Sequence, residues 1–197
     1  MRSPVAGRMS SPIRLGRAGA GAAACRLRRR AARHLRPQRR HTAPTHALGA
    51  RVRVAEPLAA LDLDSNRILV RTGPQQMATL AGAKWPDRLP LVVQARLTQS
   101  FQNAGLARQV GRNPAATANY ELDLDIRRFE LDVARSRVEV DVAAKLVSAS
   151  GGVSSAVEIF KADAPVASTR PAAVAAAMDR ALTSVMKRIV AFVATRL

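Results

Sequence analysis

Cysteine and histidine are scarce in this chain, and their distribution excludes several kinds of site. Cys25 is the only cysteine, so no disulfide can form within the chain. The three histidines (His34, His41, His46) all precede residue 51. Because residues 51–197 contain neither residue type, that part of the chain has no cysteine or histidine nucleophile and no Cys/His metal site.

Long apolar runs are also missing. No segment reaches the roughly 18 consecutive apolar residues that indicate a transmembrane helix, so none is predicted. The sequence also lacks the glycine-rich loop ending in Gly-Lys-Ser or Gly-Lys-Thr that binds nucleotide phosphates. We therefore expect no nucleotide cofactor and no ATPase activity of its own.

Acidic residues are absent from the N-terminal region. Residues 1–55 contain fourteen arginines and no Asp, Glu or Lys, whereas residues 56–197 contain eighteen Lys and Arg against fourteen Asp and Glu. Most of the formal net charge of +18 therefore lies in the first 55 residues. This region is rich in Arg, Ala, Gly and Pro and has no sustained hydrophobic period. Such a composition predicts a disordered basic tail over residues 1–50, followed by one domain over residues 51–197.

The only tryptophan opens the hexapeptide Trp85-Pro-Asp-Arg-Leu-Pro90. Apolar residues recur every four positions from Leu89 to Phe101 and predict an amphipathic helix over Leu89–Gly105. Proline is tolerated in a first helical turn, and Asp87 is placed to cap the helix or to meet the positive end of its dipole. These features suit an ordinary helix start beside a core tryptophan, and we favour that interpretation over a catalytic site.

Alternating apolar residues between positions 120 and 161 predict three strands. Tyr120 to Ile126 alternate, and after Arg127-Arg128 the phase changes by one residue, which predicts a β-bulge there. A second strand runs from Val138 to Leu146, and Ser155, Val157 and Ile159 continue into a third. The short turns between them predict an antiparallel meander with one apolar face.

The outward carboxylates of these strands, Asp123, Asp125, Glu139 and Asp141, invite a catalytic interpretation. General acid–base catalysis needs a carboxyl with a raised pKa in a dry pocket. The alternation with core residues instead places these groups on a solvated sheet face among arginines, and we favour that interpretation. An enzyme that uses these carboxylates is the least favoured function class.

A second amphipathic run, from Val174 to Val193, predicts a helix over Pro171–Arg196. The elements together predict an α+β fold, in which a mainly antiparallel sheet carries two long helices, Leu89–Gly105 and Pro171–Arg196, packed on one face. The other sheet face is expected to be polar and free for a partner.

The segment Lys84–Pro90 resembles the ABC-type transport auxiliary lipoprotein family through its Trp-x-Asp-Arg-Leu-Pro hexapeptide. The strand Arg67–Arg71 and the Tyr120-Glu-Leu pattern support the resemblance, which runs from about Arg51 to the C-terminus. Members are periplasmic auxiliary components of lipid-transport systems built around an ATPase, a permease and an MCE-domain protein. The resemblance implies a non-catalytic component, ordinarily anchored to the outer membrane, that binds or bridges these partners.

The resemblance also implies where partners bind. We expect contact at the signature residues Trp85, Asp87, Arg88, Leu89 and Pro90 and at exposed sheet edges, which can accept another strand. An apolar groove between helix and sheet that holds an acyl chain is the other interpretation. Bound lipid and association into a homo-oligomer are left open.

The family carries an N-terminal lipoprotein signal, and here Ala22-Ala23-Ala24 followed by Cys25 looks like a degraded lipobox. Cys25 would then carry the lipid. However, the stretch Ala18–Ala24 contains only Ala and Gly, which is weakly apolar for a signal, and no leucine stands three positions before the cysteine.

Two further interpretations of the tail compete with the signal. A basic arm would bind nucleic acid or an anionic membrane, because residues 26–40 contain eight arginines, although no aromatic residue among them could stack on bases. The favoured interpretation is upstream or out-of-frame translation of a GC-rich gene, since the chain has twenty-eight arginines against four lysines. A basic-arm nucleic-acid-binding protein is therefore the alternative function.

Overall fold

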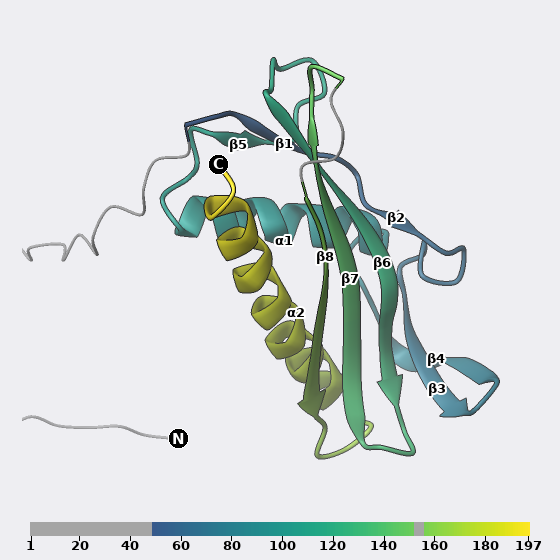
Figure 1. Ribbon diagram of the computed structural model, residues 1–197. Helices are drawn as coiled ribbons and strands as arrows, with labels where there is room; N and C mark the ends of the chain where they lie inside the picture. The colour runs from purple at the N-terminus through teal and green to yellow at the C-terminus, as the bar shows by residue number, and fades with distance from the viewer. Residues whose placement is uncertain (1–48, 152–155) are drawn as a thin grey trace, which may run out of the picture. The chain divides into compact units, whose positions relative to one another are not determined.

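The structure, a computed structural model, describes residues 49–151 and 156–197 (Figure 1). Apart from its last two residues, Gly49 and Ala50, the predicted disordered tail lies outside this part of the chain. The described residues form eight strands, namely β1 Val52–Val54, β2 Leu58–Ala59, β3 Arg67–Gly73, β4 Gln76–Lys84, β5 Val110–Gly111, β6 Tyr120–Asp132, β7 Arg137–Ser148 and β8 Ala156–Pro165. They also form two helices, α1 Leu89–Asn103 and α2 Pro171–Ala194.

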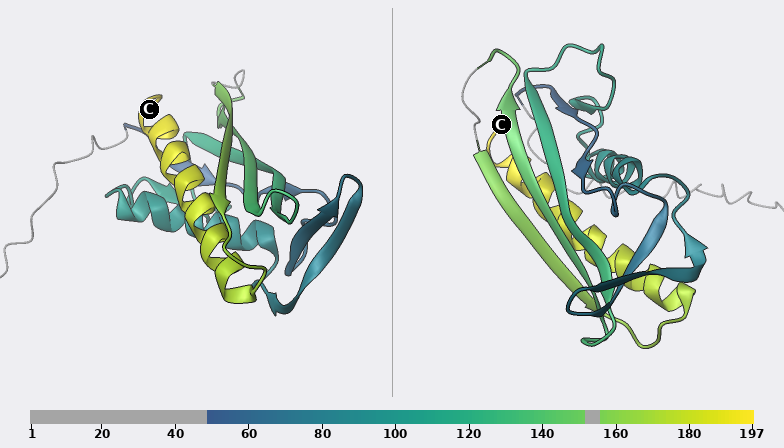
Figure 2. Two further views of the ribbon diagram at one scale, coloured as in Figure 1. Left: turned by 90° about the horizontal axis from the view of Figure 1, so that it is seen from below. Right: turned by 90° about the vertical axis from the view of Figure 1, so that its right-hand side faces the viewer.

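The eight strands form one mixed, curled sheet around the long strand β6 (Figures 1 and 2). On one side, β6 pairs antiparallel with β7, which pairs antiparallel with β8. On its other side, β6 pairs parallel with β1, β2 and β3 in succession, with Val52 opposite Tyr120, Leu58 opposite Asp125 and Val70 opposite Leu131. Strand β5 adds to β1 in parallel, and β4 adds to β3 antiparallel.

The predicted mainly antiparallel sheet is therefore wrong. The predicted meander of β6, β7 and β8 forms one side of the sheet, but the chain reaches β6 from β1, β2 and β3 through long connections that include α1. Such crossovers allow neighbouring strands to run in the same direction. The pairing of short strands with a strand more than fifty residues away leaves no mark in the local alternation of residues.

Helix α1 begins where the sequence predicts. Arg88 is its N-cap residue, and Pro90 lies in the first turn, where no helical hydrogen bond needs its missing N–H. The buried stripe contains Leu89, Val93, Leu97 and Phe101. The helix ends at Asn103, two residues before the predicted end, because Gly105 takes a φ of +83° that breaks the helical path.

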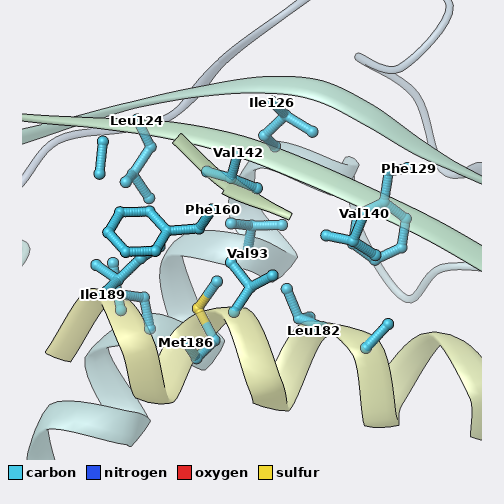
Figure 3. Close-up of a cluster of buried hydrophobic side chains, with 14 of the residues drawn as sticks. Val93, Leu124, Ile126, Phe129, Val140, Val142, Phe160, Leu182, Met186 and Ile189 are labelled. Carbon is cyan, nitrogen blue, oxygen red and sulfur yellow. The ribbon is translucent and has the colours of Figure 1, made fainter. Parts of the chain in front are cut away.

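Helix α2 packs along β7 and β8 on the inner side of the sheet. In Figure 3, Leu182, Met186 and Ile189 of α2 point toward strand residues that include Val142 and Phe160. A fully buried side chain of this size contributes about 1.5–3 kcal/mol of hydrophobic stabilisation. The continuous stripe from Val174 to Val193 therefore holds the helix to the sheet.

The β-bulge predicted at Arg127-Arg128 is confirmed. The register of β6 with β7 shifts between Ile126 and Arg128, which lie opposite Val142 and Asp141. The shift keeps both halves of β6 facing the core, because Leu122, Leu124 and Ile126 before it and Phe129 and Leu131 after it are all buried.

Candidate partner-binding surface

The tryptophan of the signature hexapeptide lies against the core. Its ring meets that of Phe129 edge-on, with centroids 5.5 Å apart and an interplanar angle of 83°. Trp85 is half-buried, and Leu89 and Pro90 are buried in the first turn of α1. These three signature residues therefore anchor the start of α1 to the sheet.

Arg88 joins the start of α1 to the segment that follows β1. Its guanidinium donates Nε–H and Nη2–H to the two carboxylate oxygens of Asp64, at 2.8 and 2.6 Å, and Nη1–H to Glu56 at 3.2 Å. The hydrogen bond from Arg88 holds the pKa of Asp64 below its usual value. A bidentate pair of this kind fixes direction as well as distance, so it orients the segment over residues 56–64.

Asp87 does not cap the helix, so the capping alternative is wrong, while its interaction with the helix dipole stays a prediction. Its Oδ1 accepts the backbone N–H of the neighbouring Arg88 at 2.7 Å, and α1 has no side-chain cap. Two backbone hydrogen bonds connect the start of α1 to the residues just before β3. The N–H of Trp85 donates to the carbonyl of Asn66 at 2.7 Å, and the N–H of Leu89 donates to that of Ser65 at 2.9 Å.

The signature residues are thus used largely inside the fold, and a direct contact of theirs with a partner stays a prediction. Only Asp87 and Arg88 among the five are exposed. Cys25, the predicted lipid attachment residue, lies outside the described residues, so its modification also stays a prediction.

The outer face of the sheet, opposite the helices, divides into two parts. The first, near the turn between β6 and β7, is here called the ion-pair region and contains Arg71, Arg128, Glu130, Arg135 and Glu139. Glu139 accepts hydrogen bonds from Arg128 at 2.6 Å and from Arg135 at 2.9 Å. Glu130 is only 4% exposed and pairs with Arg71 at 2.7 Å.

Burial tends to raise the pKa of Glu139, but the hydrogen bonds from Arg135 and Arg128 outweigh it and hold the pKa below its usual value. The arginines that were expected among the outward carboxylates are therefore bound to them. The ion-pair region satisfies its own charges and offers little to a partner.

The second part, here called the apolar region, contains Leu58, Ala143, Val157 and Ile159. Leu58 is 72% exposed, Val157 62% and Ile159 44%. The sheet register places them in one band, since Leu58 of β2 lies opposite Asp125, Asp125 opposite Ala143, and Ala143 opposite Ile159. Exposed apolar side chains gathered in this way mark interaction sites more often than scattered ones do.

A depression of about 480 Å³ lies in the apolar region. Leu58, Ala143 and Val157 contribute apolar surface, and its charged lining residues are Glu56, Asp123, Asp125 and Lys145. Burial and the negative charge of Glu121 raise the pKa of Asp123, whereas Lys145 acts in the opposite direction. The depression therefore combines an apolar floor with charges that can orient a bound segment.

Sequence reasoning missed this region because the third strand was assigned by its β-branched residues. Phe160 and Ala164 of β8 face the core at 1% and 4% exposure, so Val157 and Ile159 face outward. Assigning the inward face from Phe160, the largest side chain of the strand, would have given the observed phase. The apolar depression also lies on the sheet face away from the helices, not in the groove between helix and sheet that was considered.

Within residues 49–151 and 156–197, no three Asp, Glu, His or Cys side chains are grouped so that they could hold a metal ion. No helix of this part of the chain is long and apolar enough to cross a membrane.

A family model, that of the ABC-type transport auxiliary lipoprotein component, matches residues 34–190. The chain belongs to this family. The match begins before Arg51, where the resemblance was expected to start, and it includes every strand of the described residues. The family is named for auxiliary lipoprotein components of ABC-type transport, and membership therefore indicates a location in the cell envelope.

Solved structures support the fold of this chain. The crystal structure of protein XCC0632 from Xanthomonas campestris is similar with a TM-score of 0.71 and 32% identity, over 78% of this chain and 87% of that one. A second crystal structure, of an uncharacterized protein, has a TM-score of 0.59 and 14% identity, over 73% of this chain and 89% of that one, and supports the fold alone.

A longer relative has also been identified by sequence. Protein bll6063 of Bradyrhizobium diazoefficiens is 29% identical over 144 residues, which are 73% of this chain and 39% of the relative. The chain therefore spans about two-fifths of the length of that curated relative.

Proposed function

We propose that this auxiliary component serves an ABC-type transport system for lipids or other hydrophobic solutes, and that it acts without catalysis. It binds or bridges the MCE-domain protein, the permease and the ATPase of that system from the periplasm, anchored to the outer membrane. The domain over residues 51–197 carries the binding surface. Family membership supports the transport role, and the apolar region supports the binding role.

The observation that carries the proposal is the exposure of Leu58 and Val157 at one depression, with the exposed Ile159 beside it in the same band of the sheet. Complete burial of a Val, Leu or Ile side chain contributes about 1.5–3 kcal/mol. A partner that covers Leu58, Val157 and Ile159 therefore gains a substantial part of the free energy of a specific complex. Further contacts offset the entropic cost of association. The charged rim favours a protein partner, because its carboxylates and Lys145 can orient hydrogen-bonding groups.

One residue of the signature hexapeptide, Arg88, holds the rim of the depression. Arg88 binds Glu56, and Glu56 lies on the rim of the depression. We therefore assign Arg88 a positioning role: it holds the rim in place while the apolar residues make contact.

A charge in the apolar region tests the proposal. Val157→Glu should reduce co-purification of the transporter components with the full chain by about tenfold or more. A carboxylate in place of the valine must lose its water when a partner covers it, and Lys145 opposite it offsets only part of that cost. The matched control is Val133→Glu, because Val133 is also an exposed valine, at 38%, but lies in the turn after β6. Equal losses in both variants, or unchanged capture in Val157→Glu, would overturn the proposal.

The alternative, a basic arm that binds nucleic acid, makes the opposite prediction for the tail. A chain that starts at Arg51 should keep its melting temperature and its transporter partners if residues 51–197 are the functional domain. A basic arm would show nucleic-acid binding that falls steeply with salt and is lost with residues 1–50. Loss of transporter binding on removal of the tail would count against the proposed domain division.

A further inference from the structure

Strand β8 is an edge strand. Within the described residues it pairs only with β7, and it lies at the side of the sheet in both Figure 1 and the right-hand view of Figure 2. In an antiparallel strand, successive residues direct their N–H and C=O groups to opposite sides. Arg188 donates to the carbonyl of Lys161 at 2.8 Å, and Arg180 to that of Pro165 at 3.1 Å. The odd-numbered residues therefore point their backbone groups to the open side.

The two halves of this edge differ. In the C-terminal half, arginines from α2 occupy the carbonyls of Lys161 and Pro165, and proline has no N–H to offer. Such protection is a common means of preventing strand addition. In the N-terminal half, Val157 and Ile159 have no hydrogen bond on the open side from any residue that the structure describes. The open stretch Val157–Ile159 coincides with the exposed side chains of the apolar region.

A small pocket of about 300 Å³ lies beside the inner side of the open edge, between β8 and α2. Phe160 and Phe192 line it, with ring centroids 5.6 Å apart. The guanidinium of Arg196 lies over Phe192 and pairs with Glu158 at 3.5 Å. Arg188 lies over the Phe160 ring, 5.4 Å from its centroid, and has no carboxylate partner among the described residues.

We propose that an extended segment of a transporter partner adds as a strand to β8 along Val157–Ile159. The inference rests on the proposed function for the identity of the partner. The N–H and C=O groups of Val157 and Ile159 pair with the added backbone, which gives affinity, while alternate side chains give specificity. On its outer side the segment carries branched apolar residues that cover Val157 and Ile159. On its inner side it carries an acidic residue that pairs with Arg188.

A proline at position 159 tests the backbone part of the proposal. Ile159→Pro removes an N–H that points to the open side, so the ladder with β7 keeps its hydrogen bonds, as it does at Pro165. Ile159→Thr is the matched control, because it changes the side chain and keeps the N–H. Capture of the co-expressed MCE-domain protein by the full chain should fall about tenfold or more for Ile159→Pro, and only about threefold for Ile159→Thr.

A charge reversal on α2 tests the acidic residue of the partner. Arg188→Glu should lower capture about tenfold, since attraction becomes repulsion at the edge. Lys187→Glu is the control, because it makes the same charge change at the neighbouring, exposed residue of α2. Equal effects of the two variants would show that only net charge matters and would overturn the proposed pairing with Arg188.

Hydrogen exchange of the wild-type chain tests strand addition to β8 without any substitution, so it applies even if Ile159→Pro does not fold. The amides of Val157 and Ile159 should exchange about tenfold more slowly in the complex than in the free chain. Unchanged exchange in a formed complex overturns strand addition. Intact capture by Ile159→Pro together with loss in Val157→Glu also overturns it, while the proposed function stands.

Two other outcomes are distinguishable. If the wild-type chain dimerises and Ile159→Pro does not, as measured by sedimentation, the occupant of the edge is a second copy, and the partner assignment is overturned. If the wild-type chain captures no transporter component, the proposed function itself fails.

Discussion

The ion-pair region and the apolar region lie on the same sheet face and share the strands β6 and β7, but they differ in what they leave unsatisfied. In the ion-pair region, Glu130 and Glu139 are largely buried between the arginines that bind them. Each of these carboxylates therefore has its ion-pair partner within the chain. In the apolar region, Leu58 and Val157 are exposed to solvent by more than half of their surface. A partner that covered the first would have to displace existing pairs, whereas one that covered the second would only displace water.

This difference shows that the polar or apolar character of a sheet face is set locally and not strand by strand. Strand β7 directs Glu139 into the ion-pair region and Ala143 into the apolar region, and both are on its outer side. The four predictions that follow test this comparison in order of expected effect.

Loss of the Glu139 carboxylate should have the largest effect on stability. Glu139→Ala removes the acceptor shared by Arg128 and Arg135 and should lower the free energy of unfolding by about 2 kcal/mol, the usual value for hydrogen bonds to charged groups. Lys145→Ala, on the same strand but in the apolar region, should change it by less than about 0.5 kcal/mol. Urea denaturation measures both, and equal values would remove the distinction between the two regions.

The stability from Glu139 should be lost at acid pH. Its pKa is lower in the folded chain than in the unfolded chain, so its ionised form contributes stability that is fully present above the unfolded value. That contribution falls as pH decreases through the folded pKa. The stability difference between wild type and Glu139→Gln should therefore shrink from pH 7 to pH 3 in thermal unfolding experiments. A difference that stays constant would show that charge is not the cause.

Asp123, in the apolar region, should show the opposite sign. Burial raises its pKa in the folded chain, so ionisation destabilises the fold as pH rises from the unfolded to the folded value. Asp123→Asn should therefore be more favourable relative to wild type at pH 7 than at pH 3. Thermal unfolding at the two pH values measures this, and a shift in the same direction as for Glu139→Gln would contradict the comparison.

The smallest stability effect is expected at Ile159. Because this side chain is exposed and makes its proposed contact only in a complex, Ile159→Thr should change the unfolding free energy by less than about 0.5 kcal/mol. Chemical denaturation of the free chain gives the value. A loss of 2 kcal/mol or more, on the scale of a buried side chain, would place Ile159 in the core and remove it from the partner surface.

Local patterns predicted the elements that local residues determine. Both helices and the bulge in β6 follow from the spacing of apolar residues, and the ends of the helices differ from the prediction by two residues. The parallel half of the sheet was beyond such reasoning. Strands β2 and β5 each have two residues, too few for any period to show.

The candidate surface was harder to predict for a related reason. Exposed β-branched residues such as Val157 have the same pattern as buried ones, and only the opposing Phe160 distinguishes the two faces of β8. The interaction of Arg88 with Asp64 joins residues 24 positions apart, and nothing in the hexapeptide indicates it. The expected contact of the signature residues with a partner could not be separated from their role in the fold.

The parallel pairs of β6 also bear on how the chain is made. Strands β1, β2 and β3 leave the ribosome long before the β6 residues that they pair with. Val52 pairs with Tyr120 and Val70 pairs with Leu131, each more than sixty residues later in the chain. Contacts of such long sequence separation slow folding, because a large loop must close before they form. During synthesis β3 can pair with β4 at once, but β1 and β2 stay unpaired and one side of β3 stays open until β6 is complete. Exposed strands of this kind are prone to aggregation while they lack their partners.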